Sequence, residues 1–211
     1  MESFVLRLRA VIECGNAAHA LKDVEGFLMD PEGYALMLLA AEGYGVGEIL
    51  EVGSYMGRST CWLALGAKHA HREKVTAVDH FKGSPEHQSG RECESLALVE
   101  EGTTFNRFME NLRTAGVQDY VEPIIASSEE AVRNWNKPIR LLFIEGDHSY
   151  AASRRDYELW SPFVVPGGYI CFHDIGNAPG VTLFHQELLK QSSQYSHIVS
   201  VVSLSVLQKN A

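Results

Sequence analysis

The sequence predicts an α/β fold in which helices cover both faces of a doubly wound parallel sheet. From residue 47 onward, short apolar runs alternate with helical patterns, an order typical of parallel strands joined by helical crossovers. Right-handed crossovers then wind the sheet in both directions. A chain of 211 residues with 45% hydrophobic content can bury a full core. We therefore treat it as one structural unit.

Residues 1–46 are expected to form a helical cap on the domain that spans residues 47–211. A first helix over residues 3–14 is indicated by apolar side chains three and four positions apart, namely Phe4, Val5, Leu8, Val11 and Ile12. We expect it to pack on the domain edge or on a second subunit, the latter giving a homo-oligomer. A second helix should begin at Pro31 and end at Gly43 or Gly45.

Strands and helices alternate through the remaining chain. The predicted strands are Ile49–Val52, Val75–Val78, Val121–Ile125, Leu141–Ile144 and Tyr169–Phe172. The predicted crossover helices are Arg58–Ala67, Phe105–Ala115 (capped by Thr103 or Thr104), Glu129–Asn134 and Ser153–Trp160. A helix over Val181–Gln191 and β-rich runs at His197–Val202 and Leu204–Gln208 follow, although no glycine marks a turn between the two runs. Residues 82–102 are rich in Ser, Glu, Gly and His and predict a long surface excursion, and a loop of this size is usually a functional lid or disordered.

Composition excludes several classes of function. The net charge is −9, and no run of lysine or arginine forms a basic stripe, so nucleic-acid binding is not expected. No stretch has the length and apolarity of a membrane span. Four well-separated cysteines predict free thiols in a reducing compartment. With no secretory signal visible at the N-terminus, these features predict a cytoplasmic protein.

Residues 48–60 predict a strand, a glycine turn and a helix that begins near Arg58. Gly53 and Gly57 are spaced as G-x-x-x-G, which differs from the G-x-G-x-x-G of pyrophosphate-binding loops. Glu51 lies just before the turn, where its carboxylate would repel a pyrophosphate and attract an ammonium group. The same residues also fit a tight turn that binds no ligand.

Asp79 ends the second predicted strand, 22 residues after Gly57. An acid at about this spacing binds the hydroxyls of a ribose in nucleotide-binding folds, because a carboxylate can accept both hydroxyl protons. The alternative is a solvated strand end or a helix cap.

The stretch from Glu51 to Thr60, Glu-Val-Gly-Ser-Tyr-Met-Gly-Arg-Ser-Thr, is similar to the first motif of class I S-adenosylmethionine-dependent methyltransferases. The resemblance implies a Rossmann-like seven-stranded sheet whose last strand is antiparallel, with residues 24–28 near the mouth of the site. It also implies that S-adenosylmethionine is the cofactor. The cofactor contacts that it implies are Glu51, Gly53, Ser54, Tyr55, Gly57, Arg58, Ser59, Asp79, Ser127, Ser128 and Glu145. Ser127 and Ser128 fit an ordinary helix N-terminus equally well.

Two polar clusters end the fourth and fifth predicted strands and should face each other across the sheet edge. They contain Glu145, Asp147 and His148 in the first and His173 and Asp174 in the second. They resemble those of macrocin-type O-methyltransferases and cephalosporin hydroxylase-related proteins. We assign His148, with its ordinary pKa of about 6.5, as the base that removes the acceptor's proton, with Asp147 as a second catalytic residue.

The same clusters suggest a magnesium or manganese site at Asp147, His173 and Asp174, in which Glu145 could replace Asp147. Alternatively, His173 is a hydrogen-bonded strand-end histidine and Asp174 a helix cap. Catechol-type enzymes carry an Asp-Asn pair and a catalytic lysine, and this chain has neither in its clusters. Their mechanism therefore does not transfer intact.

Together these features predict an S-adenosylmethionine-dependent O-methyltransferase that acts on the hydroxyl of a small molecule. A non-catalytic protein that keeps the cofactor pocket is the first alternative. A nicotinamide-dependent dehydrogenase is the second, and the missing G-x-G-x-x-G and the presence of Glu51 count against it.

Overall fold

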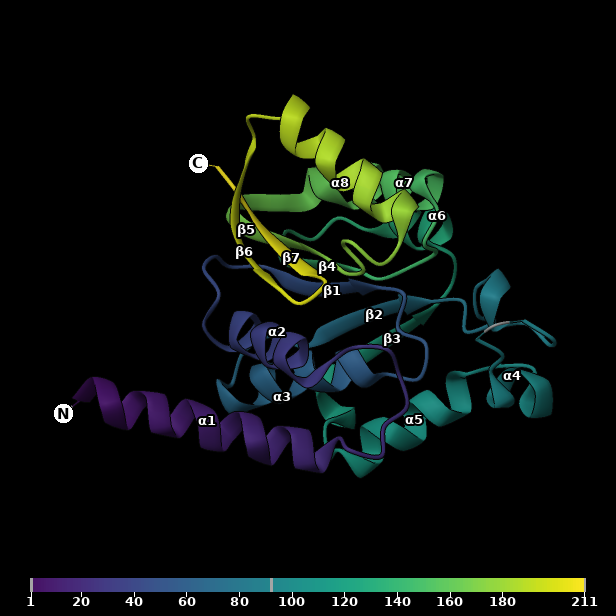
Figure 1. The fold of residues 1–211 in the computed structure, drawn as a ribbon, viewed down its shortest axis with the longest axis horizontal. Helices are drawn as coiled ribbons and strands as arrows, with labels where there is room; N and C mark the ends of the chain where they lie inside the picture. The colour runs from purple at the N-terminus through teal and green to yellow at the C-terminus, as the bar shows by residue number, and fades with distance from the viewer. Residues whose placement is uncertain (1, 92, 211) are drawn as a thin grey trace.

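A single seven-stranded sheet lies between two helical layers (Figure 1). The structure, a computed structural model, describes residues 2–91 and 93–210. The strands are β1 Glu48–Val52, β2 Val75–Asp79, β3 Val121–Ile125, β4 Ile139–Ile144, β5 Val164–Phe172, β6 Tyr195–Val201 and β7 Leu204–Lys209. The helices are α1 Glu2–Ala20, α2 Asp30–Glu42, α3 Arg58–His69, α4 Leu96–Glu101, α5 Phe105–Thr114, α6 Ser128–Ala131, α7 Tyr150–Trp160 and α8 Pro179–Gln191. Short 3₁₀ turns are η1 Pro85–His87, η2 Gln118–Tyr120, η3 Val132–Asn134 and η4 Ser161–Phe163.

The strand order is β3-β2-β1-β4-β5-β7-β6. Strands β1 to β5 pair in parallel, whereas β7 is antiparallel to both β5 and β6. The predicted mostly parallel, doubly wound sheet with an antiparallel C-terminal strand is thereby confirmed. The direction of winding reverses between β1 and β4, and a crevice opens outside the strand ends at such a point.

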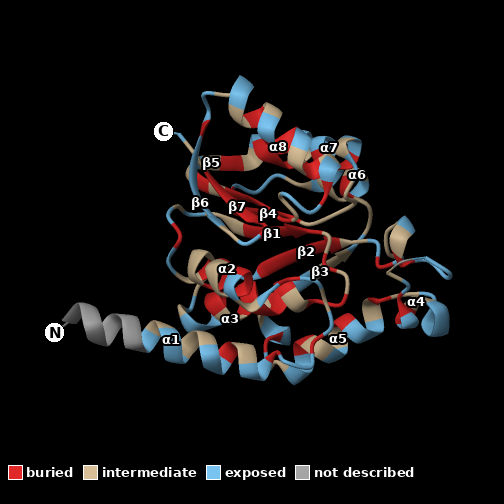
Figure 2. Cartoon of the chain, in the orientation of Figure 1, coloured by how far each residue is buried: buried red, intermediate tan, exposed pale blue. Residues whose placement is uncertain are grey.

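Each face of the sheet has its own apolar core, because side chains alternate along a strand. In β1, Ile49 packs on the side of α2, α3 and α5, whereas Leu50 and Val52 pack on the side of α7 and α8. Figure 2 shows the strands buried between these two layers. The central parallel strands are nearly continuous apolar runs because both faces are covered.

The first helix is longer than predicted and packs differently. It extends to Ala20, and its buried contacts come near its C-terminal end, at Ala17 and the following Leu21. Val11 and Ile12 remain 69% and 52% exposed, because that part of α1 projects beyond the body of the protein (Figure 1). The side chains of Phe4, Val5 and Leu8 lie outside the described residues. Packing on a second subunit stays a prediction.

Three other details of the fold could not be read from the sequence. The excursion over residues 82–102 contains η1 and α4. Strand β5 begins at Val164, because Gly167 takes a φ of 76° that lets the chain bulge where the register with β4 shifts. The β6–β7 hairpin forms without a glycine, and Val202 takes the left-handed conformation instead, with a φ of 53°.

Cys61 and Cys171 are buried free thiols, as predicted, and Cys14 and Cys93 are free and partly exposed. Among residues 2–91 and 93–210, every helix is too short or too polar to cross a lipid bilayer.

Candidate active site

A cleft of about 260 Å³ opens at the carboxyl ends of β1, β2, β3 and β4, where the winding of the sheet reverses. Its walls come from the β1–α3 loop, the end of β2, the N-terminus of α6, the β4–α7 loop and the segment before α2. In the same order, the residues of these five segments that line the cleft are Gly53–Tyr55, Asp79, Ser127–Glu129, Glu145–His148 and Glu25–Leu28. Most of the residues predicted to contact the cofactor therefore lie around one cleft, although Glu51 and Gly57 are not among its lining residues.

The β1–α3 loop needs glycine at both of its bends. Gly53 has a φ of 83°, and a Cβ there would lie 2.4 Å from the carbonyl oxygen of Glu145. Gly57 has a φ of 86°, and a Cβ there would lie 2.9 Å from the ring of Phe108. Both the conformation and the close approach therefore exclude larger residues.

Asp79 joins the end of β2 to this loop. One carboxylate oxygen accepts the backbone N–H groups of Ser54 and Tyr55 at 2.7 and 2.8 Å, and the other accepts that of Phe81 at 2.6 Å. Its side chain also lines the cleft. Asp79 therefore shapes the loop as well as offering a carboxylate to a ligand.

Glu51 does not line the cleft, contrary to the role inferred from its sequence position. Its side chain is fully buried beneath the loop. It accepts hydrogen bonds from Ser54 Oγ at 2.9 Å and Ser59 Oγ at 2.5 Å, and from the hydroxyl of Thr60. Burial raises the pKa of Glu51 to about 7, although these hydroxyls oppose the shift. Glu51 thus stabilises the β1–α3 loop and the start of α3 from inside the protein. A carboxylate that contacts the ammonium group of a ligand in the cleft would have to come from another residue.

Other residues of the first motif are also engaged within the protein. Arg58 lines the cleft, but its guanidinium donates to the carbonyl oxygens of Leu28, Leu21 and Val24 and pairs with Asp30 at 2.7 Å. These bonds hold the segment before α2 against the start of α3. Arg58 therefore positions one wall of the cleft.

An aromatic stack forms the outer wall. The rings of Tyr55 and His87 are 4.8 Å apart, and Phe27 lies 5.8 Å from Tyr55 and 5.6 Å from His87. His87, from η1, is 7% exposed, and burial lowers its pKa. The sequence favoured a solvated position for His87, because nothing in residues 82–102 indicated that this segment folds back onto the first motif.

Ser127 and Ser128 start α6, as the alternative interpretation proposed. Ser127 is the N-cap and accepts the N–H of Glu130, whose carboxylate accepts the N–H of Ser127 in return. The buried Ser128 Oγ accepts the indole N–H of Trp160 at 2.7 Å. Both residues also line the cleft, so their predicted contact with a cofactor stays a prediction.

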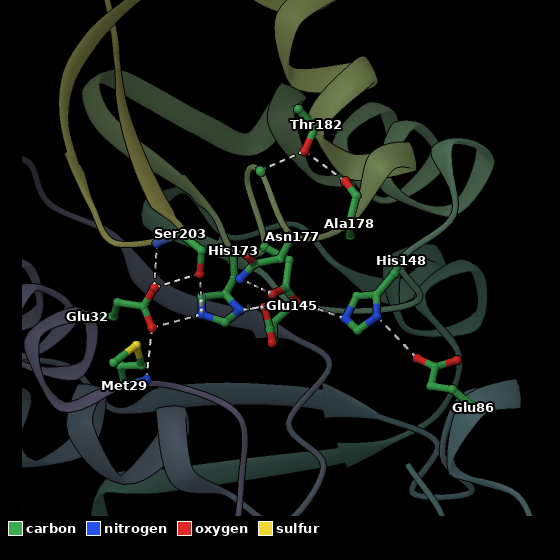
Figure 3. Close-up of polar contacts among 12 residues, drawn as sticks. Met29, Glu32, Glu86, Glu145, His148, His173, Asn177, Ala178, Thr182 and Ser203 are labelled. Carbon is green, nitrogen blue, oxygen red and sulfur yellow. Dashed lines mark hydrogen bonds and ion pairs between the residues drawn. The ribbon is translucent and has the colours of Figure 1, made fainter. Parts of the chain in front are cut away.

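His148 lies at the cleft among carboxylates (Figure 3). Its Nε2 is 3.0 Å from Asp174 Oδ2 and its Nδ1 is 3.3 Å from Glu86 Oε1. The hydrogen bond with Asp174 raises the pKa of His148, and burial opposes the shift only partly. The ordinary pKa assigned to His148 from the sequence is therefore too low.

His173 belongs to a buried network behind His148, as the alternative interpretation of this histidine proposed. Its Nε2 is 3.1 Å from Glu32 of α2 and 3.3 Å from Ser203 Oγ. Its Nδ1 is 2.9 Å from Glu145 and 3.3 Å from Asp174, although neither contact has the alignment of a hydrogen bond. Figure 3 shows this row running from Glu32 to Glu86.

Burial alone would lower the pKa of His173, but contacts with Asp174, Glu145 and Glu32 outweigh burial and raise it. His173 is thus an imidazolium at neutral pH. Burial would raise the pKa of Glu32, but hydrogen bonds from His173 and Ser203 lower it to about 2. Both shifts favour the ionised form of the two partners.

The predicted metal ligands are not the set that the structure assembles. Glu145, His148 and Asp174 offer ligand atoms that all lie within 4.8 Å of one another. Asp147 instead accepts the N–H of Ser149 at 2.7 Å, and hydrogen bonds from Ser149 lower its pKa against the opposing effect of burial. His173 is occupied by Glu32 and Ser203. The candidate metal site therefore consists of Glu145, His148 and Asp174. Glu145 replaces Asp147, which the sequence analysis had allowed. His148 replaces His173, which it had not.

The sequence analysis missed Glu32 and Asp156, although a signal was present for each. Glu32 shares a buried helical stripe with Leu36 and Ala40. Asp156 shares one with Ala152 and Trp160. A carboxylate at a core position of an amphipathic helix indicates a buried partner or a ligand.

The cleft is acidic. Six carboxylates line it (Glu25, Asp79, Glu129, Glu145, Asp147 and Asp156), against two guanidinium groups (Arg58 and Arg155). Both guanidinium groups are already paired, Arg58 with Asp30 and Arg155 with Glu129. Such a cleft repels a pyrophosphate and accommodates a cation.

Comparison with known proteins agrees with this geometry. A family model described as "Methyltransferase domain" matches residues 50–175. Among solved structures, the O-methyltransferase from Bacillus cereus in complex with SAH is 17% identical, with a TM-score of 0.62 over 95% of this chain and 91% of that chain. The O-methyltransferase TomG from Streptomyces achromogenes in complex with SAM is 16% identical, with a TM-score of 0.61 over 94% of this chain and 89% of that chain. At these identities the two structures establish the shared fold.

Proposed function

Because the chain belongs to this family of methyltransferase domains, we propose that it transfers the methyl group of S-adenosylmethionine to a hydroxyl of a small molecule. The observation that carries the proposal is the acidic cleft at the reversal point of the sheet. S-Adenosylmethionine carries an ammonium and a sulfonium but no phosphate, so this charge suits it and disfavours a dinucleotide. Similarity to O-methyltransferase structures supports a hydroxyl acceptor.

The residues present fit this cofactor. Gly53 lines the cleft, and the left-handed conformation and close packing of Gly53 and Gly57 give the β1–α3 loop the shape that brings its backbone to the cleft wall. Asp79 offers a carboxylate for ribose hydroxyls. Ser127 and Ser128 lie at the neighbouring wall, and Glu145 lies between the loop and His148. When bound, the sulfonium would supply an electrophilic methyl group. The protein's own contribution is chiefly to position the acceptor and remove its proton.

His148 is the residue proposed to take that proton. It is partly exposed at the cleft, and its Nδ1 faces Glu86 of η1, within residues 82–102. Asp174 holds the other ring nitrogen and stabilises the imidazolium that forms. Asp147 has a lowered pKa, which makes it the weaker base of the two.

A divalent cation at Glu145, His148 and Asp174 is the second arrangement that the cluster allows. A ligand set of two carboxylates and one imidazole suits manganese or magnesium less well than a set of oxygen ligands alone does. The two roles of His148 compete, because a metal bound at one ring nitrogen makes the other nitrogen a much weaker base. Methyl transfer measured with and without a chelator distinguishes them.

The proposed function is tested by calorimetric titration with S-adenosylmethionine, S-adenosylhomocysteine and NAD, followed by turnover against a panel of hydroxylated acceptors. Binding of the first two ligands and not NAD is expected. Binding without turnover on any acceptor would favour the non-catalytic alternative, and binding of NAD alone would contradict the proposal.

Replacement of Asp79 by alanine is expected to weaken S-adenosylhomocysteine binding by about 2–3 kcal/mol, the order of losing charge-assisted hydrogen bonds. Asp79→Asn keeps an acceptor oxygen for the loop and should lose less. Calorimetry measures both, and Asp119→Asn, at an exposed acid far from the cleft, is the matched control. Unchanged affinity in a folded Asp79→Ala protein would remove Asp79 from the cofactor site.

Residues 82–102 are expected to be cut by trypsin in the free protein and protected by S-adenosylhomocysteine. Lys82 and Arg91 are exposed in this segment, and its contact with the cleft runs through His87 and Glu86. Arg91→Gln identifies the fragment cut at that site, and cleavage elsewhere in the same digest is the internal control. Equal rates with and without ligand would show that the segment is not a lid.

A further inference from the structure

Both ring nitrogens of His148 are engaged by carboxylates. Nε2 lies 3.0 Å from Asp174 Oδ2, and Nδ1 lies 3.3 Å from Glu86 Oε1 of η1. Figure 3 shows Glu86 on the opposite side of the His148 ring from Glu145. A general base must approach the acceptor's hydroxyl to about 2.6–3.2 Å. One of the two carboxylates must therefore leave His148 before a hydroxyl can reach the ring.

Asp174 is fixed in its place beside Nε2. It follows directly after β5, and its side chain is 16% exposed. Its Oδ2 is also 3.3 Å from His173 Nδ1, and its Oδ1 accepts a hydrogen bond from the side chain of Asn177. Because these neighbours hold Asp174 at the end of the strand, Nδ1 is the nitrogen that can be freed.

Glu86, in contrast, is held by His148 alone. In the part of the chain that the structure describes, its carboxylate forms no ion pair with any other residue, and its Oε1 accepts no hydrogen bond. Its side chain is 31% exposed. An ion pair with this exposure contributes little stability, so the Glu86 side chain can leave Nδ1 at low cost.

The turn η1 is tied to the rest of the domain through two neighbouring side chains. The His87 ring stacks on Tyr55, and the Glu86 carboxylate faces His148. The backbone hydrogen bonds of η1 instead run within residues 82–102, to which this turn belongs. Loss of the contact between Glu86 and His148 should therefore loosen the whole segment.

We propose that Glu86 is a latch that holds residues 82–102 against His148 in the free protein, and that the acceptor's hydroxyl takes its place at Nδ1. The proposal rests on the proposed function and deepens it, because it assigns the side of His148 at which the acceptor binds. Pro85 and His87, on either side of Glu86, line the cleft together with His148. An acceptor then binds only to the fraction of molecules in which the latch is open.

Limited digestion with trypsin tests the latch in the free protein, without an acceptor. Glu86→Ala should raise the rate of cutting at Arg91 by about two- to fivefold, the effect of losing a partly exposed ion pair. His148→Ala breaks the same contact from the other side and should have the same effect. The double variant should then be cut no faster than either single variant. Glu100→Ala, at an exposed acid of the same segment, should be cut at the wild-type rate.

Steady-state kinetics test whether the latch competes with the acceptor. Glu86→Ala should lower the KM for an acceptor found in the panel by about two- to fivefold, because a larger fraction of the protein is open. The kcat of this variant should not fall. A carboxylate that orients His148 for catalysis would instead lower kcat when it is removed. Glu100→Ala should keep both constants at their wild-type values.

The outcomes separate the latch from the proposed function. Cutting of Glu86→Ala at the wild-type rate, or additive effects in the double variant, would overturn the latch. A higher KM or a lower kcat in Glu86→Ala would show that Glu86 supports the reaction, and would overturn its competition with the acceptor. Absence of turnover by the wild-type protein on every acceptor would contradict the proposed function, whereas the digestion would still decide whether Glu86 is a latch.

Discussion

Replacement of His148 by alanine is expected to reduce methyl transfer by about 10²–10⁴-fold, the contribution of a positioned general base. His148 is the titratable group that lies at the cleft with a partner on each ring nitrogen, Asp174 on one side and Glu86 on the other. His148→Gln can still donate to Asp174 but cannot take a proton, so it should lose as much activity. Both variants should bind S-adenosylhomocysteine as the wild-type protein does. His69→Ala, at an exposed histidine at the end of α3, is the control.

The pH dependence of the rate distinguishes a base from a structural residue. The carboxylate of Asp174 raises the pKa of His148, and the protonated ring cannot accept a proton. The rate should therefore rise with pH, with a midpoint above the ordinary value of 6.5. Asp174→Asn removes the charge while tolerating the left-handed φ of 60° at this position, so the midpoint should move to lower pH.

Two results would contradict the general-base role. Full activity in His148→Ala would show the cluster to be structural. Loss of activity on addition of a chelator, restored by manganese or magnesium, would instead assign His148 to a metal together with Glu145 and Asp174.

Replacement of Glu32 by alanine is expected to destabilise the fold by about 3–5 kcal/mol, because it leaves the buried His173 charge without its partner. Glu32 is fully buried. It also accepts hydrogen bonds from the N–H of Met29 at 2.8 Å and from the N–H and hydroxyl of Ser203 at 2.8 and 2.7 Å. One side chain of α2 thus ties the N-terminal segment to β5 and to the β6–β7 turn.

Denaturant unfolding measures this effect. Glu42→Gln, at the exposed end of the same helix, should change stability by less than about 0.5 kcal/mol. Glu32→Gln keeps an acceptor and should lose less than Glu32→Ala. If the double variant Glu32→Ala/His173→Ala lost the sum of the two single losses, the two side chains would not interact, and the buried pair would be refuted.

The same pair sets a pH window for stability. The pKa of Glu32 is lowered from 4.5 to about 2 on folding, so its contribution is present above about 4.5 and is lost as pH falls toward 2. The pKa of His173 is raised from 6.5, so its contribution is complete below 6.5 and declines as pH rises toward the folded value. In Glu32→Ala, the stability should fall less steeply as the pH drops from about 4.5 toward 2. Melting temperatures measured at a series of pH values in this range test the prediction.

The sequence by itself determined the α/β class, the parallel strands and the strand–glycine–helix motif. These features follow from local pattern. Apolar runs of strand length define the central strands. Gly53 and Gly57 adopt a left-handed φ, which glycine tolerates in any fold because it has no Cβ. The helical spacing of Phe105, Phe108 and Leu112 likewise specifies α5 whatever it packs on.

Only the tertiary structure decided what the polar side chains of the site face. Glu51 precedes the glycine turn in sequence, yet three hydroxyls from the loop and α3 surround it and remove it from the cleft. His173 is separated from Glu32 by 141 positions along the chain, and no periodic pattern relates residues that far apart. Ionisable groups are governed by burial and by their nearest charges, which are set when distant segments meet. For this reason the elements could be predicted, whereas the pairing of Glu32 with His173 could not.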